Sequence, residues 1–384
     1  MLASQEELFY QNDHVTFLNA AYMSPQLRSV DAAGIEAVQR KRKPHLIKPN
    51  HFFEESEQLR SEFAGLINSQ EARRCVFIPS VSYGIATVTH NLEVRAGQNI
   101  VLAGEQFPSN VYSWKRLEDT YRITLNLIPP PDTLIERGKH WNTRILEAIT
   151  EDTVAVSLGN IHWADGTLFD LKAIRQRTHE VGAALIIDGT QSVGALPFDV
   201  ASIEPDALIC GGYKWLMGPY SLGYAYFGPR FDDGIPIEEN WINRFESENF
   251  ANLVNYSDHY QPFALRYDVG EHSNFNLVPM GIEALRQVRT WTPEAIQEYC
   301  KTITQPSIQR LREAGFWIED ITSRACHLFG IRLPDHISMD TVKQRLEEEQ
   351  IIVSIRGNAI RVSPHVYNTA RDIEHLEHLI LDLA

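Results

Sequence analysis

Seven short apolar runs, separated by longer stretches of helical character, constrain the fold of this chain more than any other feature. The runs are RRCVFIP, QNIVLAG, ITLNLIP, TVAVSLG, AALIIDG, DALICGG and LGYAYFG. Their β-branched and apolar residues are typical of buried strands. Between most of them lie stretches such as LFDLKAIRQRTHEVG, with apolar residues at helical spacing and Gly182 at the end. This alternation predicts an α/β fold with a mostly parallel sheet.

The second half of the chain predicts a smaller domain of different character. With 384 residues, the chain is longer than one hydrophobic core usually supports. After about residue 255 come the helix-like IEALRQVRTW and a longer helical region, strand-like segments in HLFGIRLP and NAIRVSP, and the helical patterns ISMDTVKQRLEEEQ and DIEHLEHLILDL. We therefore expect a large domain over 23–255 and a small α+β domain formed by 1–22 and 256–384.

Charge and cysteine usage limit the possible partners. The formal net charge of -15 repels phosphate backbones, which argues against nucleic acid or an anionic membrane as a partner. The four cysteines form no CxxC pair and have no metal-ligand spacing, so we expect no metal site and a reducing compartment. The acidic, polar N-terminal segment and the lack of a long apolar run favour a cytoplasmic location.

The two residues that most strongly indicate catalytic chemistry lie at the ends of two predicted strands. Asp188 ends the run AALIID, where open α/β sheets bind ligands, although an aspartate here can also cap the next helix. Lys214 follows DALICGGY and precedes the apolar WLMGPY. A lysine after a strand is usually a solvated loop residue, but apolar surroundings lower the pKa of the amine and let it form an imine. Together they predict a pyridoxal 5′-phosphate (PLP) site, in which Asp188 pairs with the pyridinium nitrogen.

Two further segments supply candidates for the phosphate and the ring of PLP. In VFIPSVSYGIATV, a strand ends at Pro79 and a helix begins near Ser82, so its free N–H groups and hydroxyls favour an anion. An ordinary helix N-cap explains the same pattern equally well. Phe107, in EQFPSN, follows the strand QNIVLAG and can stack on a flat ring, although taken alone it reads as a core residue.

A series of motifs then resembles the class V aminotransferase family of fold-type I PLP enzymes, which includes cysteine desulfurases, kynureninases, isopenicillin N epimerase-like proteins and C–S lyases. The motifs, in the family's order, are FLNAAYMSP, SVSYGIATV, EQFPSN, HWADGTLFDL, IIDGTQSVGALPFDV, ICGGYKWLMGP and IRVSPHVYNTARDIEHL. The resemblance covers nearly the whole chain. It implies a large domain with a mostly parallel seven-stranded sheet and a small C-terminal α+β domain.

The resemblance also implies a role for each candidate residue. Lys214 is expected to hold PLP as a Schiff base and to move the substrate α-proton. Arg361 is expected to grip the substrate α-carboxylate, which suits a bidentate guanidinium. The remaining contacts to PLP are expected from Asp188 at the ring nitrogen, Gln191 at the phenolic oxygen, Phe107 over the ring, and Ser82, Tyr83 and Tyr213 at the phosphate.

Two implied features extend beyond one cavity. In this family a neighbouring subunit often completes the phosphate site through a loop matching RYDVGEHSNFN, so Ser273 and Asn274 are candidates and a homodimer is expected. His162, in NIHWADG, matches a position close to the cofactor ring, and a buried structural histidine explains it equally well.

The reaction itself stays open at this point. The segment VSIRGNAIRVS has no cysteine where desulfurases of this family carry one, which argues against a persulfide mechanism. Cys326 is interpreted as structural. The first hypothesis is an aminotransferase acting on an amino acid or small amine. The alternatives are a C–S lyase, a kynureninase-like hydrolase or an epimerase on the same scaffold, and a catalytically silent binding protein.

Overall fold

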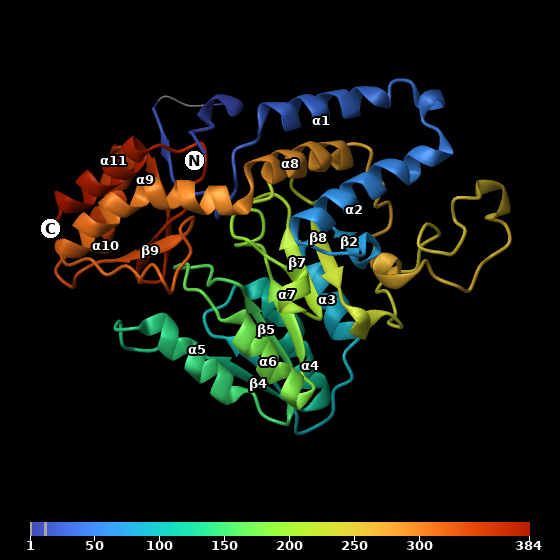
Figure 1. Cartoon of the computed structure of the whole chain (residues 1–384), viewed down its shortest axis with the longest axis horizontal. Coiled ribbons are helices and arrows are strands. Elements are labelled where there is room, and N and C mark those ends of the chain that lie inside the picture. The colour runs from blue at the N-terminus through green and yellow to red at the C-terminus, as the bar shows by residue number, and fades with distance from the viewer. Residues whose placement is uncertain (1, 11–13) are drawn as a thin grey trace.

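The structure, a computed structural model, describes residues 2–10 and 14–384 and is built around one large twisted sheet (Figure 1). The sheet has the order β2-β8-β7-β6-β5-β3-β4. Only β8 runs antiparallel to its neighbours. Its strands are β2 (Cys75–Ile78), β3 (Asn99–Ala103), β4 (Thr124–Ile128), β5 (Thr153–Gly159), β6 (Ala184–Asp188), β7 (Ala207–Gly211) and β8 (Gly223–Phe227). Each of the seven predicted runs contains one of these strands.

Helices cover both faces of this sheet because side chains alternate along each buried strand. Along β6, for example, Leu185 and Ile187 pack on one face and Ala184 and Ile186 on the other. The first face is covered by α2 (Glu54–Leu66), α5 (Arg137–Ala148), α6 (Leu171–Val181) and α8 (Leu277–Trp291). The other is covered by α3 (Val81–His90) and α4 (Tyr112–Tyr121), and the short α7 (Val200–Ile203) joins β6 to β7. Helix α6 ends at Gly182 in the left-handed conformation, as predicted.

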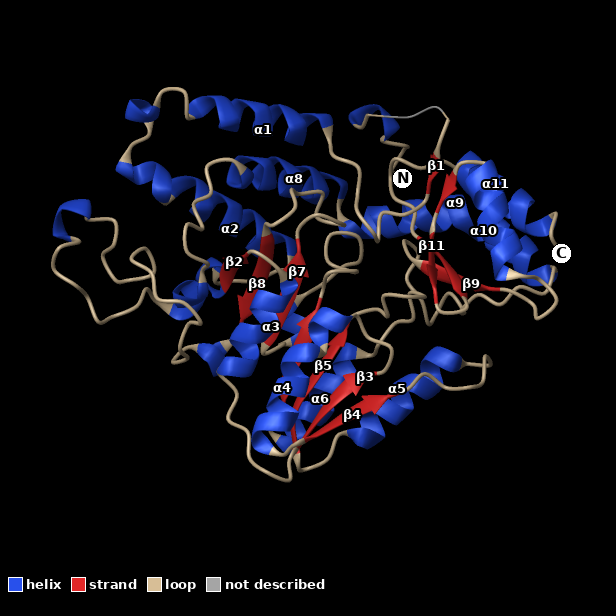
Figure 2. Ribbon diagram, turned by 180° about the vertical axis from the view of Figure 1, so that it is seen from behind, coloured by secondary structure: helices blue, strands red, loops and turns tan. Residues whose placement is uncertain are grey.

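A second, smaller unit lies at one end of the molecule (Figure 2). Its antiparallel sheet has the order β11-β12-β9, and a parallel pair joins β1 to β10. The strands are β1 (Thr16–Phe17), β9 (Phe329–Arg332), β10 (Ile351–Ile352), β11 (Ser354–Arg356) and β12 (Ala359–Val362). The helices are α9 (Pro293–Glu313), α10 (Met339–Glu348) and α11 (Ala370–Leu381), while α1 (Arg28–Arg40) packs along α8. No helix in the described ranges is long and apolar enough to cross a membrane.

The hydrophobic clusters can be compared with the expected domain boundary at residue 255. The N-terminal residues Phe9 and Leu18 share a hydrophobic cluster with the small unit, and residues 1 and 11–13 of the predicted segment 1–22 lie outside the described residues. Beyond residue 255, however, Ala264 and Tyr267 pack in the core of the large sheet. Helix α8 contributes to the clusters of both units. The division at 255 stays a prediction.

Candidate active site

A cavity of about 370 Å³ opens at the edge of the large sheet where the parallel strands end. Strands β2, β5, β6 and β7 point in one direction, so their carboxyl ends meet there. The volume lies in the range typical of small-molecule sites. The predicted residues that line this cavity are Ser82, Phe107, His162, Asp188, Gln191, Tyr213 and Lys214.

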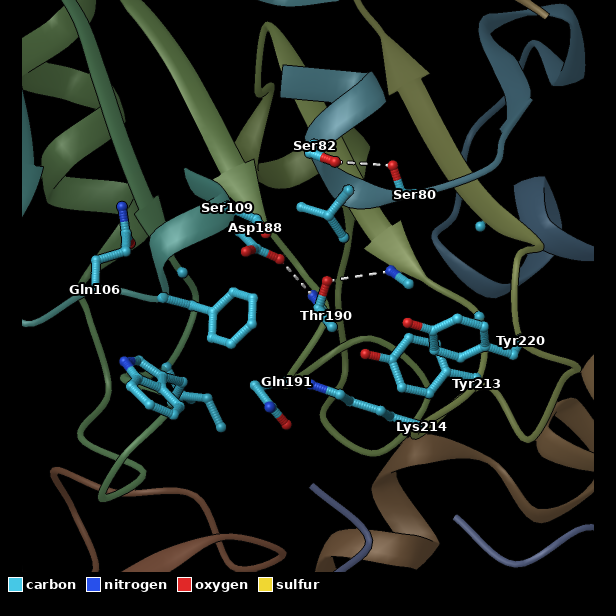
Figure 3. Close-up of a pocket in the computed structure, with 18 of the residues that line it drawn as sticks. Ser80, Ser82, Gln106, Ser109, Asp188, Thr190, Gln191, Tyr213, Lys214 and Tyr220 are labelled. Carbon is cyan, nitrogen blue, oxygen red and sulfur yellow. Dashed lines mark hydrogen bonds between the residues drawn. The ribbon is translucent and has the colours of Figure 1, made fainter. Parts of the chain in front are cut away.

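The N-terminus of α3 forms one end of the cavity. Ser80 is the N-cap, and its Oγ accepts a hydrogen bond of 3.2 Å from the Tyr83 N–H and lies 2.9 Å from the Ser82 Oγ. Figure 3 shows both hydroxyls at the cavity wall. The remaining N–H groups of the first turn and the positive end of the helix dipole suit an anion such as a phosphate.

Asp188 ends β6 and ties this strand to its neighbour. Its Oδ1 accepts a 3.0 Å hydrogen bond from the Thr190 N–H, and the Thr190 Oγ1 accepts one of 3.1 Å from the Gly211 N–H (Figure 3). Burial raises the pKa of the Asp188 carboxyl, while the Thr190 hydrogen bonds and Lys214 lower it. A cationic group in the cavity would therefore find a carboxylate whose charge is poorly solvated and in need of a partner.

Lys214 lies beyond the end of β7 with only 7% of its surface exposed. Burial and the charge of Arg361 lower the pKa of its amine to about 8, although the charge of Asp188 acts in the opposite direction. The Nζ atom is 5.7 Å from the centre of the Phe107 ring and 5.5 Å from that of Tyr213. A lysine in these surroundings is uncharged in an appreciable fraction of molecules near neutral pH, as a nucleophilic amine must be.

Gln191 is held in one orientation by hydrogen bonds on both sides of its amide. Its Oε1 accepts a 2.9 Å hydrogen bond from the Trp215 Nε1–H, and its Nε2 donates one of 3.0 Å to the Ala21 carbonyl. Because an indole N–H can only donate, the amide oxygen must face Trp215. The second hydrogen of the Gln191 amide is left for an acceptor in the cavity.

A second cavity of about 330 Å³ adjoins the first. Lys214 stands on the wall that the two cavities share, together with Phe107, Trp163, Gln191, Tyr213 and Tyr220. The second cavity adds Ala21, Tyr22, Met23, Arg356 and Arg361. A small molecule in either cavity is thus within reach of the same amine.

Arg361 lies on β12 and is almost completely buried, with 1% of its surface exposed. Its Nη1 donates to the Trp163 carbonyl at 3.1 Å and its Nη2 to the Ser354 Oγ at 3.2 Å. The Nε is buried and has no hydrogen-bond partner. Burial and the charge of Arg356 lower the pKa of Arg361 to about 9, so the guanidinium stays charged at neutral pH. The second cavity is therefore lined by a cation that no carboxylate among its lining residues neutralises.

His162 lines the first cavity, but its ring nitrogens face protein groups. The Nε2 is 3.2 Å from the Glu105 carbonyl and the Nδ1 is 3.3 Å from Asp165. Asp165 also pairs with Arg137 at 2.9 Å. Burial favours a neutral Asp165, but the nearby His162 and Arg137 hold its pKa below its ordinary value. His162 therefore contributes a packed, oriented ring to the cavity wall.

Three predicted residues do not line either cavity. Burial and nearby Glu238 raise the pKa of Tyr83, which places its hydroxyl beside Glu238. The Asn274 Oδ1 accepts from the Asn276 and Leu277 N–H groups at the start of α8. Ser273 beside it is buried. Their predicted role concerns a neighbouring subunit, which one chain does not test.

Several lining residues were not predicted from the sequence. Ser80 lies two residues before Ser82, Thr190 directly precedes Gln191, and Trp163 directly follows His162. For Arg356, the sequence pattern that could have indicated its position is a predicted hairpin. The dipeptide Gly357-Asn358 separates two short runs, which is typical of a hairpin, and a hairpin there pairs Arg356 with Ala359 and brings it near Arg361. Among the described residues, no three His, Cys, Asp or Glu side chains gather so that they could hold a metal ion.

Comparison with solved structures defines the fold class. A lysine-to-alanine mutant of C-DES, with glycine covalently linked to its PLP cofactor, superimposes with a TM-score of 0.86 at 18% identity, covering 99% of this chain and 100% of that one. The apo cysteine desulfurase of Thermococcus onnurineus gives 0.83 at 17% identity, covering 100% and 98%. These likenesses confirm the predicted fold-type I architecture of a seven-stranded, mostly parallel sheet with a smaller C-terminal unit.

Sequence comparison then shows the family. The profile of the family Aminotransferase class-V matches residues 38–376, so this chain belongs to the class V aminotransferases and its cofactor is PLP. The uncharacterized aminotransferase YcbU of Bacillus subtilis is 27% identical over 323 residues, which is 84% of this chain and 82% of YcbU. A cysteine desulfurase of Pectobacterium atrosepticum is 24% identical over 260 residues, or 67% of this chain and 61% of its own length.

The side chains of the first cavity suit PLP. The partly buried carboxylate of Asp188 matches a protonated ring nitrogen, and the N-terminus of α3 matches a phosphate. The amine of Lys214 lies between them and the second cavity. At Gly212, an added Cβ would collide with the Leu222 carbonyl, so only glycine lets the loop that carries Lys214 fold back this tightly.

Proposed function

We propose that this protein is a PLP-dependent aminotransferase that acts on an amino acid or a small amine through Lys214. The observation that carries the proposal is the position of the Lys214 amine on the wall between two cavities, one beside Asp188 and the other beside Arg361. A cofactor held on one side and a carboxylate held on the other bring the reacting groups to one amine. Such positioning supplies a large part of the rate enhancement of an enzyme.

Lys214 is assigned the roles of nucleophile and base. When bound, PLP supplies an aldehyde that condenses with amines and a ring that accepts the electron pair released at the substrate α-carbon. The lowered pKa, about 8, lets the Lys214 amine react with an aldehyde and later accept a proton from that carbon. The apolar and aromatic surroundings exclude water from this proton.

The other residues are assigned to the two ends and the faces of PLP. Asp188 keeps the ring nitrogen protonated, and the free hydrogen of the Gln191 amide donates to the phenolic oxygen. Phe107 and His162 pack against the ring. Ser82, with Ser80, donates to the phosphate at the start of α3, and Tyr213 completes this end. Tyr83, whose hydroxyl lies beside Glu238, is not assigned to the phosphate.

Arg361 is assigned to the substrate α-carboxylate. Its unpartnered Nε and its position on the second cavity support this assignment. A carboxylate held there fixes which bond of the α-carbon is aligned for cleavage.

We further propose a cytoplasmic homodimer in which Ser273 and Asn274 reach the phosphate site of the partner subunit. Asn274 is exposed and, within residues 2–10 and 14–384, forms hydrogen bonds through its Oδ1, so its Nδ2 can donate to a partner. Sedimentation of the PLP-loaded protein tests the dimer. The N274D variant keeps the helix-capping oxygen but loses the donor, so it should lower PLP affinity while the dimer persists. A monomeric protein, or unchanged PLP affinity in N274D, contradicts the assignment.

A C–S lyase is the second candidate. It is favoured by the likeness to C-DES, described as a cystine C–S lyase in complex with its product cysteine persulfide, which matches with a TM-score of 0.84 at 18% identity. Neither cavity is lined by a cysteine, so a lyase here would release its sulfur product without passing it to a thiol of this chain.

One experiment separates the two candidates. The purified protein should be yellow, and borohydride should fix the cofactor to Lys214. On mixing with an amino acid, an aminotransferase converts its cofactor to the pyridoxamine form and stalls until a 2-oxo acid is added. A lyase returns PLP on every turnover and releases product without a 2-oxo acid. A colourless protein that stays unlabelled after incubation with PLP contradicts both candidates.

A further inference from the structure

Two arginines point into the second cavity from one face of the β11–β12 hairpin. The register pairs Ser354 with Arg361 and Arg356 with Ala359. Residues two apart on a strand share a face, so Arg356 and Arg361 are diagonal neighbours, with backbones about 7–8 Å apart. Both guanidinium groups lie over the ring of Trp163, at 5.2 Å for Arg356 and 5.8 Å for Arg361.

No carboxylate neutralises these two charges within residues 2–10 and 14–384. Neither arginine forms an ion pair there, and the cavity lining contains no Asp or Glu. Arg356 donates to the Ile355 carbonyl and Arg361 to the neutral oxygens of Trp163 and Ser354. The Nε atoms of both are buried without a hydrogen-bond partner.

Three fully buried arginines elsewhere in this protein have the partners that Arg356 and Arg361 lack. Arg60 pairs with Asp268 at 2.8 Å and Arg137 with Asp165 at 2.9 Å. Arg324 has no buried ion pair, but its Nε, Nη1 and Nη2 all donate hydrogen bonds. Arg361 is buried and Arg356 is half-buried. Charges removed from water in this way are costly without a partner, so two of them in one cavity indicate that a ligand brings the counter-charges.

The cofactor does not bring them. The proposed phosphate site lies at Ser80 and Ser82, and neither Arg356 nor Arg361 lines the first cavity. An α-carboxylate neutralises one guanidinium and leaves the other. We propose that Arg356 binds a second acidic group, so that the substrate is an amino acid with a carboxylate, or another acid of the same charge, on its side chain.

The charges of the two arginines also act on Lys214. After burial, Arg361 is the strongest influence that lowers the pKa of the Lys214 amine, and Arg356 acts in the same direction. A dianionic substrate cancels both effects at once and favours the ammonium form that results when Lys214 takes up a proton. A neutral side chain leaves the repulsion from Arg356 in place.

The binding test uses the PLP-loaded protein and acids that lack an amine, so it is independent of the reaction. Calorimetry compares glutarate and succinate with the monoacids butyrate and propionate. We expect the diacids to bind about 10-fold more tightly, or more, since charge-assisted hydrogen bonds to carboxylates are strong. R356Q should remove this preference and change monoacid binding less than about twofold. R361Q should weaken all four acids.

Control variants separate a local contact from charge and folding effects. R371Q removes the same charge from the exposed surface of α11 and should leave every affinity within about twofold. R356K keeps a cation in place and should retain part of the preference for diacids, even if R356Q proves unstable. Equal binding of diacids and monoacids, or equal weakening of both by R356Q, overturns the proposal, because the arginines then share one carboxylate.

The reaction with amino acids provides a second test of the proposal. This inference rests on the proposed function for the chemistry at the amine, and the expected order is glutamate or aspartate before glutamine or asparagine in forming the pyridoxamine form. Should no amino acid react while diacids still bind preferentially, the proposed function fails and the anion site stands. Should all four amino acids react alike, the proposed function stands and the inference fails.

Discussion

The two cavities that share Lys214 are assembled in different ways. The cavity beside Asp188 is lined mainly where consecutive strands of one sheet end. The cavity beside Arg361 takes Ala21 and its neighbours from the N-terminal segment, Trp163 from a loop after β5, and Arg356 and Arg361 from the hairpin of the small unit. The cofactor side is thus fixed by the large sheet, while the substrate side depends on how the two units pack. Reaction specificity within one scaffold is expected to vary on the second side.

The largest effect is expected for K214A, because Lys214 belongs to both cavities. Loss of the base should slow conversion of the cofactor by an amino acid at least about 1000-fold. Borohydride should no longer fix PLP to the chain. Stopped-flow absorbance and mass spectrometry measure the two effects.

A matched control for K214A is K301A, which removes an exposed lysine from α9. It should react at the wild-type rate. A K214A protein within about tenfold of wild type would contradict the assignment of Lys214 as the base.

D188N tests the cofactor side alone. The amide fills the same space but cannot stabilise a protonated ring nitrogen by its charge, so kcat should fall about 100-fold. The binding of glutarate in the second cavity should change by less than about twofold. Steady-state kinetics and calorimetry measure the two quantities.

D335N, which changes an exposed aspartate after β9, is the control for D188N and should alter neither kcat nor binding. If D188N weakens glutarate binding as strongly as it lowers kcat, the two cavities do not act separately.

The same contrast explains what the sequence could predict. Asp188 and Lys214 could be predicted because apolar strands indicate where a parallel sheet ends, and all seven strands of the large sheet lie within predicted runs. Gln191 was predicted from the family resemblance. Arg361 was likewise predicted from the family resemblance alone, and Arg356 was not predicted. Its site exists because β11 and β12 pair and carry it to Trp163, nearly two hundred positions earlier in the chain. Local patterns do not encode such a long-range contact.

The pH dependence of PLP attachment distinguishes the two sides at a single amine. The uncharged fraction of Lys214 rises tenfold for each pH unit below its pKa of about 8 and then levels off, so the attachment rate to the apoprotein should follow it. Asp188 raises this pKa and Arg361 lowers it. D188N should therefore move the midpoint to lower pH and R361Q to higher pH.

Absorbance traces between about pH 6 and 10 measure these midpoints. Shifts of both variants in the same direction, or a wild-type midpoint near the ordinary lysine value of 10.5, would show that Lys214 does not sense the two cavities separately.

The smallest effect is expected for W215F, which keeps a large ring but removes the donor to the Gln191 Oε1. Trp215 packs edge-on against His327 at 4.4 Å, and phenylalanine preserves part of that contact. Without the indole N–H, the Gln191 amide can rotate and present its oxygen to the phenolic oxygen of PLP. One hydrogen bond contributes about 0.5–1.5 kcal/mol, so kcat should fall about three- to tenfold.

The control W317F removes an indole donor to the Leu134 carbonyl, away from both cavities, and should leave kcat unchanged. Because Trp215 acts only through Gln191, the double variant W215F/Q191A should be no slower than Q191A. Additive losses in this cycle would show instead that Trp215 acts by packing alone, and that the orientation of Gln191 is set by its contact with the Ala21 carbonyl on the substrate side.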